Sequence, residues 1–264
     1  MSVDEALLRG LLAAVVVVGG VFGLAALESV LLRPERGVLS TFSRARAQLM
    51  QRSQLSSDGV AGIAGLIVAL LGPAVAAAFL STSTSLSALA AAALLLTVPA
   101  PVLVTLGTAN DERGRLALHD ALAQLTRRAL AIVAVVTATG SQSPHRHVVV
   151  VVVAAFAILV LVRSRHRGAP TAQPRFDDRL AGPALVVFRV TERAVVVVVA
   201  ALGAAAVFDL SGSWLALVVT PLAVVGGGVV MARSMGTLRG EGVGGPLFLL
   251  MVASVGRAAL SLLD

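Results

Sequence analysis

The chain contains no cysteine, no tyrosine and a single tryptophan among its 264 residues, and only 13% of its residues are charged. Without cysteine it can form no disulfide bond and can hold no zinc or iron–sulfur centre through thiolates. Any electron transfer would therefore take place in a partner. Lysine is also absent, so all 21 basic residues are arginine. Together with the abundance of alanine, valine and glycine, this bias is typical of a GC-rich bacterial genome.

Long apolar runs dominate the sequence. Hydrophobic residues make up 57% of the chain, and its mean hydropathy is +0.93. Several runs reach the roughly 18 residues expected of membrane spans, which predicts an all-α, polytopic membrane protein. We expect a single transmembrane domain, residues 1–264, with about eight helices because a backbone in lipid must satisfy its own hydrogen bonds. The expected spans are residues 7–29, 59–80, 86–108, 117–140, 147–162, 183–208, 214–233 and 243–261.

The arginines lie mainly on one side of these spans. Fourteen fall in or beside four alternate connections, and only Arg9 and Arg146 fall on the opposite side. The positive-inside rule then places the basic loops in the cytoplasm and both termini outside. The same distribution explains the net charge of +7 without a nucleic-acid partner, because no basic region is interleaved with aromatic residues. The first apolar run, which follows Asp4 and Glu5 and lacks a clean cleavage site, is expected to be an uncleaved span.

Two of the predicted cytoplasmic loops are longer than turns. Loop 33–58 mixes large apolar residues with arginine and glutamine, which predicts a helix lying along the membrane interface. Loop 163–182 contains Pro170 and Pro174 and is expected to be irregular.

Ionisable residues inside spans are the first candidates for function, because inserting one costs about 2.5–3.5 kcal/mol. Glu28 ends the first predicted span. Asp120 and Arg127 lie seven residues apart in the fourth and so share one helix face, with Gln124 between them. We expect this polar stripe to face protein or a hydrated cavity rather than lipid.

A second charged group opens the sixth predicted span. Arg189 and Glu192 are three residues apart, a spacing that permits an ion pair within one helix. Arg189 and Arg193 also suit the cytoplasmic membrane boundary, where long basic side chains extend toward water. Asp177 and Asp178 lack a third ligand at a useful spacing, so we predict no metal site.

Four motifs carry a family resemblance. Residues 86–141 contain a span, a polar break "TANDERG" at Thr108–Gly114, and an amphipathic entry into a span that ends in "ATGS". The stretch "FRVTER" places Glu192 before a small and apolar span, and "ARSMGTLRGEG" forms an arginine-containing loop at Ala232–Gly242. "ESVLLRPERG", Glu28–Gly37, ends the first span in an acid and continues into a basic segment.

In this order of features the chain resembles the quinone-site membrane subunit of respiratory complex I and its counterpart in energy-converting membrane hydrogenases. The family's glutamate-rich loop before the sixth span is short and basic here, and the family's Gly-Pro pattern after the first span is missing. The chain would therefore be a divergent member.

The resemblance implies a non-catalytic oxidoreductase subunit in the bacterial plasma membrane, which contributes to a quinone site or a proton-translocation path. It assigns quinone as the candidate ligand. The expected partners are membrane lipid, other membrane subunits, and a peripheral iron–sulfur or hydrogenase-like subunit on the cytoplasmic side. The residues that would line the ion path or quinone chamber are Glu28, Asp120, Arg127 and Glu192. The residues that would dock the peripheral subunit are Arg36, Arg113, Arg233 and Arg239.

Two other functions fit the same residues. A small secondary transporter would use arginines to bind an anionic substrate, and spans broken at Pro73, Pro99, Pro101 and Pro221 suit that class. The anion-binding candidates in that case are Arg127, Arg128, Arg189 and Arg193. A purely structural membrane subunit would use its charges only as ion pairs.

Overall fold

The computed structural model describes residues 15, 17–27, 29, 37–50, 59–82, 87–106, 112–141, 145–165, 180 and 182–207. All regular structure within these ranges is helical, which confirms the all-α prediction for this part of the chain. The helices are α2 (Gly37–Met50), α3 (Gly59–Thr82), α4 (Ser87–Ala93), η3 (Leu94–Thr97), α5 (Ala100–Leu106), α6 (Glu112–Gly140), α7 (Arg146–Arg165) and α8 (Pro183–Val207). A further helical stretch, Val17–Leu27, precedes them.

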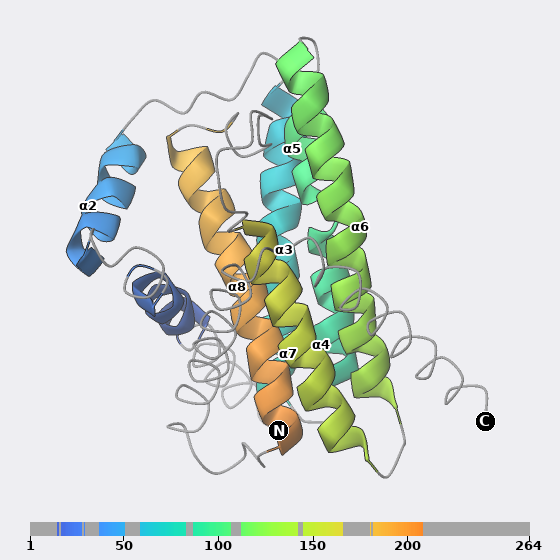
Figure 1. The fold of residues 1–264 in the computed structure, drawn as a ribbon. Helices are drawn as coiled ribbons and strands as arrows, with labels where there is room; N and C mark the ends of the chain where they lie inside the picture. Colours follow the sequence, from blue (N-terminus) through green and yellow to red (C-terminus); the bar gives the residue numbers. More distant parts are fainter. Residues whose placement is uncertain are drawn as a thin grey trace, which may run out of the picture.

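The long helices pack side by side, with α2 on the flank of the bundle beside α8 (Figure 1). Helices α3, α6, α7 and α8 cover the segments predicted from apolar runs at 59–80, 117–140, 147–162 and 183–208. Helix α2 occupies the part of loop 33–58 for which a helix was expected. The predicted segments 214–233 and 243–261 lie outside the described residues.

The segment predicted as one span at 86–108 is broken into α4, η3 and α5. The break is a tight 3₁₀ turn, in which the backbone N–H of Val98 donates to the carbonyl of Leu95 at 3.1 Å. Pro99 follows immediately and has no N–H to continue an α-helical ladder. Regular bonding resumes where the N–H of Leu103 donates to the Pro99 carbonyl at 3.0 Å.

Two described helical stretches are long and apolar enough to cross a membrane, namely Leu89–Leu106, which includes this break, and Glu112–Gly140. Three further apolar helical stretches among the described residues are shorter, at 10–17 residues: Val17–Leu27, Gly62–Ala77 and Val148–Ile158.

Helix α3 packs through glycine. A Cβ added at Gly65 would lie 2.7 Å from a methyl of Val104 and 2.9 Å from its backbone nitrogen, and one at Gly72 would lie 2.3 Å from the methyl of Thr97. These contacts bring α3 close to α5 and η3. Large apolar residues of α3, such as Ile67, point outward and are exposed. Small residues inside with large apolar residues outside reverse the usual pattern of water-soluble helices and are typical of helices packed in lipid.

Helix α8 lies at the centre of the bundle and packs against α2, α3, α4 and α7. It begins at Pro183, after Gly182, whose φ of 63° is a left-handed conformation that favours glycine. From Ala194 to Leu202 each of its residues is buried. A helical segment that is apolar and buried on all sides belongs to the core. Because Glu192 and Arg193 directly precede this segment, their backbone is held beside the core.

Candidate functional site: a polar layer across the bundle

Buried polar side chains lie between two apolar clusters of the bundle. The larger cluster includes Leu94 of η3, Ile132 of α6 and Val196 of α8. The smaller cluster includes Val104 of α5 and Phe188 of α8. Between the two clusters, η3, α6 and α8 carry polar side chains that are buried or nearly buried. We call these residues the polar layer: Thr97, Gln124, Arg128, Thr191 and Glu192.

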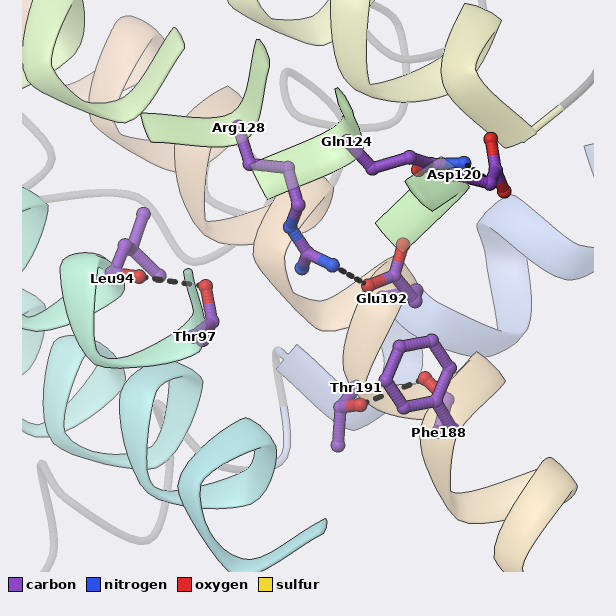
Figure 2. Close-up of polar contacts among 8 residues, drawn as sticks. All are labelled: Leu94, Thr97, Asp120, Gln124, Arg128, Phe188, Thr191 and Glu192. Atoms are coloured by element: carbon purple, nitrogen blue, oxygen red, sulfur yellow. Dashed lines mark hydrogen bonds and ion pairs between the residues drawn. The ribbon is translucent and has the colours of Figure 1, made fainter. Parts of the chain in front are cut away.

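An ion pair between two helices forms the centre of the polar layer. The guanidinium of Arg128 on α6 donates to a carboxylate oxygen of Glu192 on α8 (Figure 2). The side chain of Arg128 is only 4% exposed and that of Glu192 is 12% exposed. Burying either charge alone would cost several kcal/mol, and the attraction between the two charges offsets part of that cost. The pair also fixes the rotational setting of α6 against α8.

Helix α6 extends the polar layer toward one end of the bundle. Asp120, Gln124 and Arg128 follow each other at intervals of four residues and therefore lie along one face. The side-chain amide of Gln124 donates to a carboxylate oxygen of Asp120 at 3.5 Å (Figure 2). Gln124 is buried and Asp120 is half-buried. The stripe thus leads from a partly accessible acid to a buried charge pair.

The two threonines of the polar layer satisfy their own hydroxyls. Thr97 donates to the Leu94 carbonyl and Thr191 to the Phe188 carbonyl, each at 2.7 Å (Figure 2). Such bonds to the preceding helical turn are the common solution for a buried threonine. The chemistry of the layer therefore depends on its charged and amide side chains.

The Nε of Arg128 is a buried hydrogen-bond donor. Among the described residues, no hydrogen-bond partner faces its Nε, although that atom is buried. An unmet buried donor costs about 1–3 kcal/mol or more when charged. The layer therefore has the capacity to bind one further acceptor, such as water or a ligand oxygen.

The structure places some of the predicted site residues together and others apart. Asp120 belongs to the polar stripe along α6, and Glu192 belongs to the polar layer. Arg127, which precedes Arg128 on α6, is half-buried. Arg113 is exposed in the first turn of α6. The remaining predicted site residues, Glu28, Arg36, Arg233 and Arg239, lie outside the described residues.

The pairing of Glu192 with Arg128 was not predicted from the sequence, which assigns Arg128 only to the anion-binding alternative. Arg128 pairs with Glu192 across 64 residues of sequence. The ion pair expected within one helix between Arg189 and Glu192 stays a prediction. The available signal was the four-residue spacing from Asp120 through Gln124 to Arg128, which places the arginine on the same face as the amide.

Among the described residues, no group of three or more histidine, aspartate and glutamate side chains is arranged to hold a metal ion. Asp177 and Asp178 lie outside these residues. No protein-family model matches this chain, and no curated protein matches it.

Proposed function

We propose that this chain is a multi-pass protein of the bacterial plasma membrane, with about eight spans, both termini outside and basic loops in the cytoplasm. The inverted packing of α3 supports this, because exposed Ile63, Ile67, Leu70 and Leu71 would be costly in water and favourable in lipid. The two helices of sufficient length and apolarity agree with it.

Within that membrane, the proposed function is that of a non-catalytic subunit of a complex I-like or hydrogenase-like oxidoreductase. The observation that carries the proposal is the buried Arg128–Glu192 pair, with its polar continuation through Gln124 to Asp120. Glu192 is the residue that the sequence resemblance aligns with the family glutamate. A largely buried carboxylate that pairs with an arginine of another helix suits an ion path or the edge of a quinone site, because ionisable residues inside a membrane are commonly part of such sites. Peripheral redox subunits would supply the electrons.

The proposal is tested by purifying the tagged full-length chain from its native membrane. We expect iron–sulfur-containing partners to copurify, and we expect Glu192→Gln to lower ion-coupled redox activity of that complex by about tenfold or more, the size of effect reported for losing a proton-transfer group. Arg115→Gln, at an exposed position of α6, is the matched control and should leave activity unchanged. A chain that purifies alone, without redox partners, would contradict the proposal.

A small permease for an anionic substrate is the second candidate, and the broken helix favours it. The break at Leu94–Thr97 lies at the level of the polar layer, and Pro73 of α3 follows Gly72, which contacts Thr97. Broken spans beside a buried charge are typical of transporter binding sites. The unused Nε of Arg128 would then meet a substrate oxygen. Uptake of one small anion by a chain that purifies without redox partners would support this candidate over the first.

A further inference from the structure

Helix α2 carries a surface that the proposed ion path does not use. Phe42 holds α2 to the bundle, since its ring lies 5.8 Å from that of Phe22, centroid to centroid, and α2 also contacts α8. Leu39 and Met50 of α2 are exposed, with exposed fractions of 85% and 79%. Large apolar side chains exposed to that degree mark an interaction surface.

Basic charge accompanies these apolar residues. Leu39, Arg46 and Met50 are separated by seven and four residues, so they share one face of α2, and Arg46 is exposed. Arg44 is also exposed, about 140° around the helix axis from Leu39. The helix contains no acidic residue to offset either arginine. A helix that exposes both arginines and large apolar residues matches the boundary between acyl chains and anionic headgroups.

The position of α2 favours lipid over a docked protein subunit. Figure 1 shows α2 on the flank of the bundle beside α8, rather than across the end of the long helices. In a membrane protein the flank is the side that meets lipid. The outward residues of α3, such as Ile67, are apolar without accompanying arginines, so they suit the hydrocarbon region instead.

We propose that α2 binds anionic phospholipid at the cytoplasmic membrane surface, with Leu39 and Met50 in the acyl region and Arg44 and Arg46 against the headgroups. This inference rests on the proposed membrane location of the chain. It adds a binding surface for a lipid class, independent of the redox or transport role of the polar layer.

The absence of cysteine allows a direct test, because each introduced cysteine carries the only label. The full-length Met50→Cys variant, labelled with an environment-sensitive fluorophore, is placed in nanodiscs of phosphatidylcholine with increasing phosphatidylglycerol. We expect quenching by a lipid-attached quencher to rise with phosphatidylglycerol while quenching by iodide falls. With Arg44→Gln and Arg46→Gln added, the midpoint should shift to higher phosphatidylglycerol by about fivefold for each arginine removed. With both arginines replaced by lysine, the midpoint should be retained.

An Ile67→Cys label on α3 separates the two ways in which the test can fail. If Ile67 is quenched by lipid while Met50 is quenched by iodide at every lipid composition, the membrane location holds and the lipid surface on α2 is wrong. Protection of Met50 from both quenchers would mean that protein covers α2, which also overturns the inference. If Ile67 is not quenched by lipid, the membrane location itself is wrong.

Discussion

Replacing Glu192 by alanine is expected to lower the free energy of unfolding by about 3–5 kcal/mol, the largest effect that we predict for any single substitution at the polar layer. The change leaves the guanidinium of Arg128 on a side chain that is only 4% exposed, and its Nε already lacks a partner among the described residues. Arg128→Ala should also destabilise the protein, because it removes the arginine that pairs with the largely buried Glu192 carboxylate. The measurement is unfolding of the purified protein in mixed detergent micelles with increasing dodecyl sulfate.

The double variant Arg128→Met with Glu192→Met distinguishes an unpaired charge from lost packing. Because it removes both charges and keeps side-chain volume, we expect its stability to lie within about 1 kcal/mol of the wild type. A double variant as unstable as the sum of the two single variants would show that the charges do not act as a pair, and would contradict the geometry described above.

The substitution Gly65→Ala in α3 is expected to cost about 1–3 kcal/mol of stability through overpacking. Its Cβ would lie 2.9 Å from the backbone nitrogen of Val104 and 3.1 Å from the carbonyl oxygen of Ala100. Backbone atoms cannot rotate away as a flexible side chain can, so α3 and α5 would have to separate. Gly72→Leu should cost more, since even its Cβ would meet Thr97 at 2.3 Å beside the helix break.

Gly19 provides the matched control for Gly65. It is also helical, but a Cβ added there meets nothing within 4 Å. Gly19→Ala should therefore be neutral or stabilise the helix by up to about 1 kcal/mol, as expected from the helix propensities of the two residues. Equal costs for Gly65→Ala and Gly19→Ala in the same micelle titration would show that α3 does not approach α5 closely.

The sequence predicts helices well here because apolar runs of this length leave the backbone few alternatives. The predicted segment 183–208, for example, differs by one residue from α8. The break within 86–108 could be anticipated from Pro99, but not the close approach of Thr97, in the 3₁₀ turn, to Gly72 of α3. Composition alone contains no information on such a contact.

The polar layer was predicted only in part, for a different physical reason. Periodicity along one helix identifies residues that share a face, which is how the link between Asp120 and Gln124 was anticipated. It does not show which face meets which neighbouring helix. The pairing of Arg128 with Glu192 depends on how α6 and α8 are set against each other, and a single sequence gives no direct signal of that arrangement.

If the Arg128–Glu192 pair serves ion movement, as proposed above, it does more than hold two helices together. The most direct test measures proton movement across sealed native-membrane vesicles that contain the Arg128→Met, Glu192→Met double variant, beside its stability and its retention of partners. We expect the assembled complex to be retained at near wild-type stability, while redox-driven proton movement falls by about tenfold or more. Wild-type proton movement by an equally stable double variant would contradict it and would make the pair a structural contact.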